Sequence, residues 1–236
     1  MRNRKNLILI LVLVGIVAAS LTSYVLANAK SQPTKINQQY LQAFFARYVD
    51  ALNTPTCSAS TGYYSPNAVS VGAWGIEMDN KARQAYFCEC KSAFPTAQLK
   101  IKSLTIEPTS ETSGRITWEF GIKAGKQVKP FLGVMGKNYQ STPDDSMAFD
   151  HSGVSIAEVE IVDQAALAGI NSLRQQIASI DSQMARGGME QQAASLREKR
   201  TLLDQQLGDL MISSIKITRQ TSFQNMDAFL KKLKGE

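Results

Sequence analysis

Few side chains in this sequence have the types needed for catalysis or metal binding. His151 is the only histidine, and Cys57, Cys88 and Cys90 are the only cysteines. One histidine leaves little room for a Ser-His-Asp arrangement, and one histidine with three cysteines does not make a zinc pattern. His151 could act as a general base if it points into a cavity, or it could be a structural or exposed residue of a strand. We therefore expect no metal and no cofactor.

The three cysteines have two interpretations. Outside the cytoplasm, Cys57 could form a disulfide with either Cys88 or Cys90, which would leave one thiol free. Alternatively, all three are small hydrophobic side chains of a core.

Aromatic side chains provide a second candidate site. Five of them could line a hydrophobic pocket for a ligand, although core packing would account for the same residues: Tyr48, Tyr64, Trp74, Trp118 and Phe149. A site of this kind would bind a small apolar molecule.

The N-terminal segment, residues 1–29, predicts export. A basic start with Arg2, Arg4 and Lys5 precedes 21 uncharged residues, 7–27. This stretch is long enough to span a bilayer core of about 30 Å as a helix, with the basic residues cytoplasmic. Because the segment ends in Ala27, Asn28 and Ala29, it also fits a signal peptide cleaved after Ala29. Both interpretations place residues 30–236 outside the cytoplasm, in the cell envelope or secreted.

The charge of the chain gives no indication of nucleic-acid binding. The formal net charge is +6 over 236 residues. Without Arg2, Arg4 and Lys5, 23 basic residues face 20 acidic ones, which leaves +3. Such a balance is typical of an ordinary protein surface.

Hydrophobic periodicity after the polar linker 30–35 predicts both helices and strands. Helices are expected over 36–52, from the cap Asp79 to about 94, and over 225–233. Strands are expected over 68–76, 99–107, 115–123, 147–162 and 214–223, with a short turn or helical piece at 63–67 and a long loop over 125–145.

Residues 165–212 show heptad spacing on both sides of Arg186-Gly187-Gly188. The first arm carries Ile170, Leu173, Ile177, Ile180 and Met184, and the second carries Met189, Ala193, Leu196, Arg200, Leu203, Leu207 and Leu210. This pattern predicts an antiparallel coiled-coil hairpin over 164–212, placed between two neighbouring strands. The hairpin could project to bind a protein partner or a second copy, or it could lie flat as extra core cover. Arg200 at a seam position is expected to reach out of the seam or to mark a contact with another chain.

The element order predicts an α+β fold, formed by residues 36–163 and 213–236. Three helices would pack against a strongly curved, mostly antiparallel sheet. A sheet of this curvature forms a cone with an apolar cavity between the sheet and the helices.

Several segments in order resemble the nuclear-transport-factor-2-like (NTF2-like) superfamily, closest to its SnoaL-like, polyketide-cyclase-like branch. They are Lys81-Ala-Arg-Gln-Ala-Tyr-Phe, Ser92-Ala-Phe-Pro-Thr-Ala-Gln-Leu-Lys-Ile, Ile116-Thr-Trp-Glu-Phe-Gly, Phe131-Leu-Gly-Val, Gly153-Val-Ser-Ile and Asp227-Ala-Phe-Leu-Lys-Lys-Leu-Lys-Gly. The resemblance covers residues 36–163 and 214–235. In that family a tight turn joins the last two strands, so the resemblance implies that the hairpin replaces this turn after Asp163.

The catalytic pattern of the cyclase-like members is only partly matched. Where they carry a histidine after the tryptophan-bearing strand, this chain has Lys123. Where they place an acid/base aspartate at the end of the last strand, this chain has Asn225, with Asp227 two residues later. An amide cannot transfer a proton near neutral pH, so Asp227 is the better candidate. Both residues could instead cap and begin the last helix, with Asn225 also beside the pocket.

These observations lead to two function hypotheses. The first is an exported, membrane-anchored NTF2-like protein that acts by binding, with a ligand pocket and a hairpin for protein contact. The second is a SnoaL-like cyclase or isomerase, in which Asp227 or His151 moves a proton next to a carbonyl.

Overall fold

The computed structural model describes residues 36–72, 75–124, 128–129, 149–186 and 190–224. The chain divides into two compact units, residues 1–34 and residues 35–236, and every described residue belongs to the second. Among the described residues, no helix has the length and apolar composition required to cross a membrane. The predicted leader 1–29, the linker 30–35 and the last helix 225–233 lie outside the described residues.

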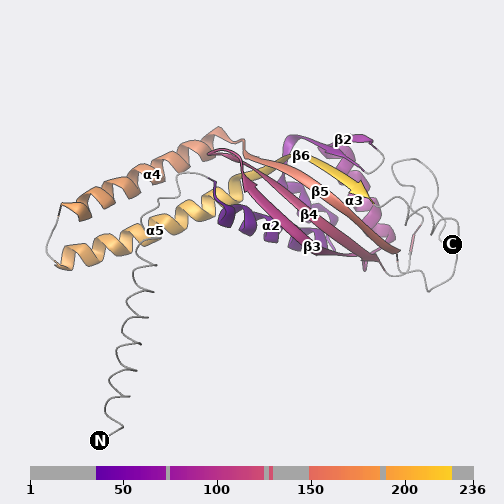
Figure 1. The fold of residues 1–236 in the computed structure, drawn as a ribbon, viewed down its shortest axis with the longest axis horizontal. Coiled ribbons are helices and arrows are strands. Elements are labelled where there is room, and N and C mark those ends of the chain that lie inside the picture. The colour runs from indigo at the N-terminus through magenta and orange to yellow at the C-terminus, as the bar shows by residue number, and fades with distance from the viewer. Residues whose placement is uncertain (1–35, 73–74, 125–127, 130–148, 187–189, 225–236) are drawn as a thin grey trace, which may run out of the picture. The chain divides into compact units, whose positions relative to one another are not determined.

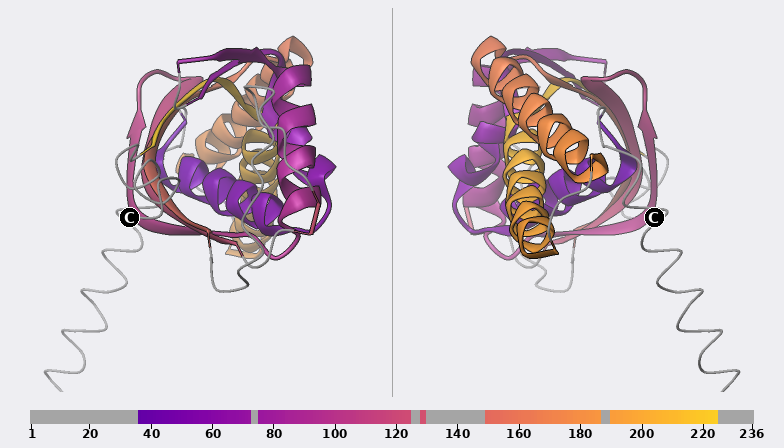
Figure 2. Two further views of the ribbon diagram at one scale, coloured as in Figure 1. Left: turned by 90° about the vertical axis from the view of Figure 1, so that its right-hand side faces the viewer. Right: turned by 90° about the vertical axis from the view of Figure 1, so that its left-hand side faces the viewer.

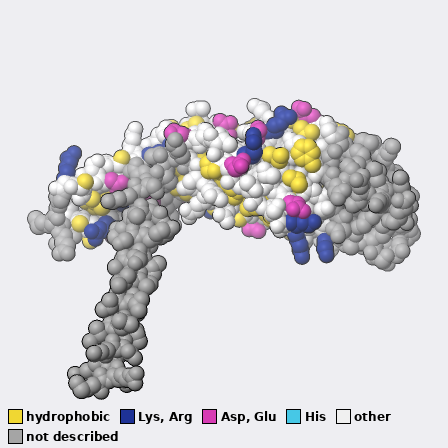
Figure 3. Space-filling view, viewed as in Figure 1, with side chains coloured by type: hydrophobic (Ala, Val, Ile, Leu, Met, Phe, Trp, Pro, Cys, Tyr) yellow, Lys and Arg dark blue, Asp and Glu magenta, His cyan; other side chains and the backbone are white. Residues whose placement is uncertain are grey.

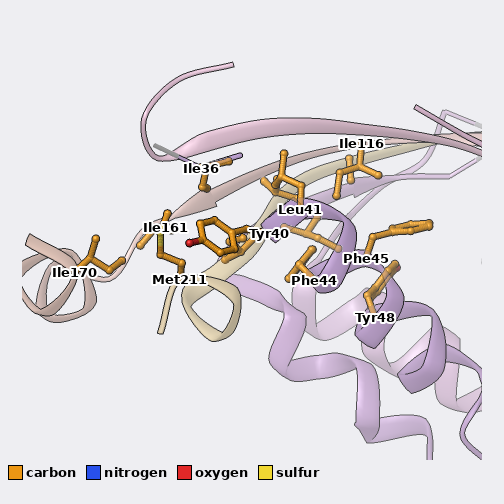
Figure 4. Close-up of a cluster of buried hydrophobic side chains, with 14 of the residues drawn as sticks. Ile36, Tyr40, Leu41, Phe44, Phe45, Tyr48, Ile116, Ile161, Ile170 and Met211 are labelled. Carbon is orange, nitrogen blue, oxygen red and sulfur yellow. The ribbon is translucent and has the colours of Figure 1, made fainter. Parts of the chain in front are cut away.

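Helix α2 (Gln38–Asn53) is the central helix of the core. The side chain of Asn37 accepts a hydrogen bond from the backbone N–H of Tyr40 at 2.9 Å, which caps the helix just after its predicted start. Its 3-and-4 spacing of apolar residues puts one face against the sheet, as Figure 4 shows. The buried residues of that face are Tyr40, Leu41, Phe44, Phe45 and Tyr48.

Two further helical segments follow. The 3₁₀ helix η1 (Cys57–Tyr63) leads into the first strand. Helix α3 (Asn80–Ala93) begins where predicted, because Asp79 Oδ1 accepts a hydrogen bond from the backbone N–H of Ala82 at 2.7 Å. It ends just before Pro95, as expected from the restricted backbone next to proline.

The sheet has six strands in the order β2-β1-β6-β5-β4-β3. Their bounds are β1 Tyr64–Val71, β2 Glu77–Asp79, β3 Gln98–Pro108, β4 Ser113–Ala124, β5 Phe149–Ile161 and β6 Ile215–Gln224. All neighbours pair antiparallel except β1 and β6, which pair parallel. Figure 2 shows the sheet curving around α2 and α3. The predicted α+β class and mostly antiparallel sheet are therefore confirmed.

The predicted single strand over 68–76 was wrong. The chain turns between Gly72 and Gly75, where Gly75 N–H donates to Gly72 O at 2.9 Å and Gly75 has a positive φ of 69°. Glycine adopts this conformation at little cost, so the segment forms the β1–β2 pair instead of one strand. β1 also begins earlier than expected, at Tyr64, with a register shift between Tyr64 and Val69.

Helices α4 (Gln164–Ala185) and α5 (Glu190–Ser214) lie between β5 and β6 along the chain. The strands that flank them are neighbours, as predicted, with pairing that reaches Ile161 opposite Ile215. Figures 1 and 2 show α4 and α5 side by side, and a Cβ placed on Gly169 would lie 3.1 Å from Leu210. The side chains buried on these helices are Ile170, Ile177, Ile180, Leu203, Leu207 and Met211.

The two ends of the helical pair have different surroundings. Near the sheet, α5 packs on α2: a Cβ at Gly208 would lie 3.5 Å from the Tyr40 ring, and Arg47 is 3.8 Å from Asp209. Ile170 and Met211 join the same core cluster as Ile36 (Figure 4). The C-terminal end of α4 and the start of α5 lie away from the sheet (Figure 1). One half thus extends the core, and the other half projects.

The expectation that Arg200 reaches out of the seam was wrong. Its Nε donates to Asp181 Oδ1 at 2.6 Å and its Nη1 donates to Asp204 Oδ2 at 2.6 Å, with the side chain only 19% exposed. In the structure, Asp181 lies opposite Arg200 and supplies the carboxylate that makes a partly buried guanidinium tolerable.

Candidate functional site: a buried polar cluster

A group of hydrogen-bonded polar side chains lies inside the otherwise apolar core. The hydroxyl groups of Tyr48 and Tyr64 are 2.6 Å apart, and both donate toward Gln220 Oε1, from Tyr48 at 3.2 Å. Both tyrosines are almost fully buried. They come from α2 and β1, while Gln220 comes from β6, the strand that pairs with β1. The cluster therefore joins three elements that are distant in the sequence.

The cluster has fewer donor protons than oxygen–oxygen contacts. Each phenol has one proton and Gln220 Oε1 only accepts, so two protons serve three oxygen contacts. Burial raises the pKa of Tyr64, and burial together with the neighbouring Tyr64 raises the pKa of Tyr48 well above its ordinary value. Both phenols are therefore neutral donors at physiological pH.

The polar cluster continues across the inner face of the sheet through serines. Ser155 of β5 faces Ser222 of β6 in register, with their hydroxyl oxygens 2.7 Å apart. Ser70 of β1 is opposite Gln220, and its hydroxyl oxygen is buried without a hydrogen-bond partner. Because side chains alternate along a strand, Gln220 and Ser222 share one face of β6.

Arg83 of α3 brings a positive charge to the cluster. Its guanidinium carbon lies 3.5 Å from the centroid of the Tyr64 ring, and the residue is only 7% exposed. Its Nη2 makes two long hydrogen bonds, 3.4 Å to Asn80 Oδ1 and 3.5 Å to Gln84 Oε1. Its Nε is buried and has no hydrogen-bond partner. Among the described residues, no carboxylate forms an ion pair with Arg83.

The disulfide of this structure anchors the helix that carries Arg83. Cys57 of η1 is bonded to Cys88 of α3, and Gln84 Nε2 donates to Cys57 O at 3.0 Å. Of the two pairings left open by the sequence, the structure therefore has Cys57 with Cys88. Cys90 is free, and burial raises the pKa of its thiol to about 12.

One side of the cluster is aromatic. Trp118 of β4 lies 6.2 Å from Tyr48 and 5.1 Å from Phe45, measured between ring centroids. Three predicted pocket residues, Tyr48, Tyr64 and Trp118, are thus brought together.

The remaining predicted site residues cannot be placed in the cluster. Trp74, Asn225 and Asp227 lie outside the described residues. Phe149 and His151 belong to β5, but their side chains also lie outside what the structure describes. Within the described residues, no group of acidic, histidine or cysteine side chains is arranged to bind a metal ion.

The sequence reasoning missed Arg83 and Gln220. Arg83 shares a helical face with Phe87 and Cys90, at spacings of 4 and 3, which could have indicated a buried arginine. Residues 218–222 are all polar, so no alternation marks Gln220 as an inward-facing residue.

No family model and no curated protein sequence matches the chain. The chain is similar to the solved structure of a protein described as a SnoaL-like polyketide cyclase from Jannaschia, at 11% identity, with a TM-score of 0.46, over 86% of this chain and 94% of that one. A protein described as a scytalone dehydratase from Novosphingobium aromaticivorans is 10% identical, with a TM-score of 0.46, over 80% and 83%. An NTF2-like protein from Shewanella oneidensis is 10% identical, with a TM-score of 0.42, over 80% and 99%.

These solved structures include NTF2-like and SnoaL-like proteins, which is the resemblance predicted from the sequence. The similarity concerns the fold. The function proposed below rests on the geometry of this chain.

Proposed function

We propose that this chain is a binding and assembly protein that holds a small ligand against the polar cluster and contacts a protein through α4 and α5. The observation that carries the first part is the hydrogen-bonded group of Tyr48, Tyr64 and Gln220 inside the core. Buried polar groups stabilise a fold less than apolar packing does, so a polar cluster of this kind is typical of a site kept for recognition.

The chemistry of the cluster favours binding over proton transfer. A cyclase or isomerase needs an acid or base that titrates near neutral pH. Burial raises the pKa of both phenols further from that range, and the Gln220 amide does not titrate there. Neutral donors, an amide and aromatic rings are instead suited to orient a ligand with a polar group and an apolar body.

Ligand binding is tested by purifying residues 30–236 and analysing the native protein by mass spectrometry, with extraction of any bound small molecule. We expect a ligand to co-purify with the wild-type protein and with Tyr63→Phe, and to be lost from Tyr64→Phe and Gln220→Leu. Tyr63 is the matched control because its ring packs against Phe44 and Tyr48 in the same aromatic group. Retention of the ligand by all variants would exclude this cluster as the site.

The second part of the proposal concerns α4 and α5 as an inserted hairpin of the NTF2-like fold. A tight turn would suffice to join β5 to β6, because these strands pair up to the base of the helices. The helices have 22 and 25 residues, or about 33 and 38 Å of length. Their heptad seam, and Leu202 with 55% of its surface exposed, support contact with a partner or a second copy.

Assembly is tested with a variant in which residues 178–202 are replaced by a short glycine-serine linker. This shortened hairpin keeps Ile170, Ile177, Leu203, Leu207 and Met211, which are buried in the wild-type protein. We expect light scattering to give a larger assembly, or affinity capture to give an envelope protein, with residues 30–236 and not with the variant. If residues 30–236 and the shortened variant are both monomers and neither captures a protein, the proposal is contradicted.

Export to the cell envelope is the third part. The leader pattern of residues 1–29 supports it, and so does the Cys57–Cys88 disulfide, because disulfides persist in oxidising compartments. Residues 7–27 would form a single membrane span, or the mature chain would begin after Ala29. Membrane fractionation and N-terminal sequencing of the native protein distinguish the two, and a reduced protein in the cytoplasm would contradict both.

A further inference from the structure

Arg83 is a buried positive charge that has no carboxylate partner among the described residues. A guanidinium carries five N–H donors, and a buried charge is costly unless it is paired. Among the described residues, Nη2 hydrogen-bonds only neutral amide oxygens, both at the long limit. A side-chain hydrogen bond from Arg83 lowers the pKa of Tyr64. Nε has none, although it is buried.

The position of the guanidinium is held by its neighbours. It stacks on the Tyr64 ring at 3.5 Å, and α3 is fixed by the Asp79 cap and by the disulfide from Cys88 to Cys57. Stacking covers the face of the planar guanidinium and not its edge, where Nε–H has no hydrogen-bond partner and an Nη2–H points the same way. That edge is the one from which arginine donates two parallel hydrogen bonds to a carboxylate.

From this geometry we infer that Arg83 binds the anionic group of the ligand, and that the ligand is a carboxylate attached to an apolar or aromatic body. This inference rests on the proposed function and names the ligand class of the same site. The carboxylate would supply the charge that Arg83 lacks. Aromatic side chains lie nearby for the apolar part, with Tyr64 stacked on the guanidinium and Trp118 against Tyr48.

The test compares a charged probe with a neutral one of the same shape. Benzoate and benzamide are titrated into residues 30–236 by isothermal calorimetry, and acetate and phenyl phosphate serve as further arms. Hydrogen bonds to a charged group are stronger than neutral ones, so we expect benzoate to bind about tenfold or more tighter than benzamide. Equal affinities, or binding of phenyl phosphate alone, would overturn the carboxylate assignment.

Variants of Arg83 test whether this residue binds the carboxylate. Arg83→Gln removes the charge and Arg83→Lys keeps the charge without the planar fork, while Arg115→Gln, which loses an exposed ion pair with Glu158, is the matched control. We expect the preference for benzoate to disappear in Arg83→Gln, to be reduced in Arg83→Lys and to be unchanged in Arg115→Gln. A preference that persists in Arg83→Gln would overturn the inference.

The probe comparison on the wild-type protein decides the question even if Arg83→Gln does not fold. Failure of this inference is also distinguishable from failure of the proposed function. A neutral ligand that co-purifies and is lost from Tyr64→Phe would retain the proposed site and reject the carboxylate.

Discussion

Tyr48 and Tyr64 do not contribute independently to the stability of this protein. Their hydroxyl groups contact each other and the same oxygen of Gln220. Removing one hydroxyl leaves the other with a single remaining contact and leaves a buried polar atom with fewer partners. The free energies of unfolding of the two single variants should therefore not add.

We predict that Tyr48→Phe and Tyr64→Phe each lower the free energy of unfolding by about 1–2 kcal/mol. The double variant should lose less than the sum, by about 0.5 kcal/mol or more, because the second substitution removes a contact already broken. Urea unfolding of the four proteins measures this, with Tyr63→Phe as the control for removal of a phenol oxygen. Strict additivity would contradict a shared network.

The same phenols make stability depend on alkaline pH. Burial raises the pKa of both above the ordinary value of about 10, so above that pH the unfolded chain releases protons that the folded chain retains. The unfolded state then binds fewer protons, and the free energy of unfolding falls as pH rises above about 10.

We expect the urea midpoint to fall less between about pH 8 and about pH 10.5 in the double phenylalanine variant than in the wild-type protein. An equal fall of the urea midpoint in both proteins would show that other groups cause the loss of stability at alkaline pH.

At the residue scale, the sequence predicted that buried aromatic side chains meet, but not which polar side chains join them. Tyr48, Tyr64 and Trp118 were expected to meet because large aromatic residues on buried faces converge in a core. Gln220 and Arg83 were not, because a polar residue in a strand or helix is usually exposed. The pairing of β6 with β1 brings Gln220 beside Tyr64, and no local pattern indicates this pairing.

At the scale of elements, the helical pair α4 and α5 is joined by charge as well as by apolar packing. Arg200 bridges Asp181 on the facing helix and Asp204 one turn along its own helix. Burial raises the pKa of Asp204, Arg200 lowers it, and Asp181 raises it. Without Arg200, two carboxylates would face each other in a partly buried place.

We predict that Arg200→Met lowers the free energy of unfolding by roughly 1–3 kcal/mol at neutral pH, a value reduced from the fully buried case because the group is partly exposed. With Arg200 gone, the folded-state pKa of Asp204 rises further. A raised carboxyl pKa costs stability above the unfolded-state pKa, and the full cost is present above the folded-state pKa. The deficit should therefore shrink as pH falls toward about 4.

Urea unfolding at the two pH values tests this, with exposed Arg197→Met as the matched control on the same helix. A deficit that is independent of pH would contradict the carboxylate explanation.

The ends of elements were predicted well where a capping side chain marks them. Asp79 marks the start of α3, and Asp163 caps α4 through a hydrogen bond to the backbone N–H of Ala165 at 2.8 Å. The error at residues 68–76 arose because β-branched residues continue on both sides of Gly72. Hydrophobic pattern alone cannot distinguish one strand from two that fold back on each other.

At the scale of the whole described unit, the sheet should fold without the projecting half of the helical pair. The shortened hairpin keeps the core around Ile36, Tyr40 and Met211 and the β5–β6 pairing. We predict that it unfolds cooperatively, with amide hydrogens of β5 and β6 protected as in the wild-type protein. Loss of protection in these strands would show that the distal helices are required for the fold.

The outer surface agrees with the modest net charge. Basic and acidic side chains are interspersed on the face drawn in Figure 3. Exposed ion pairs join Lys102 to Glu119 and Arg115 to Glu158, at 3.9 and 3.8 Å. The described part of this face therefore lacks the single-sign field that attracts a polyanion.

The strand order has a consequence for the time course of folding. β6 is the last strand of the described chain, yet it lies between β5 and β1 in the interior of the sheet. During synthesis, β1 and β2 must therefore wait for the rest of the sheet, with their hydrogen-bonding edge unsatisfied. The contacts between α4 and α5 are local and form quickly, and their closure returns β6 to β5. The sheet can therefore be completed only after the helical pair has been synthesised and has brought β6 back to β5.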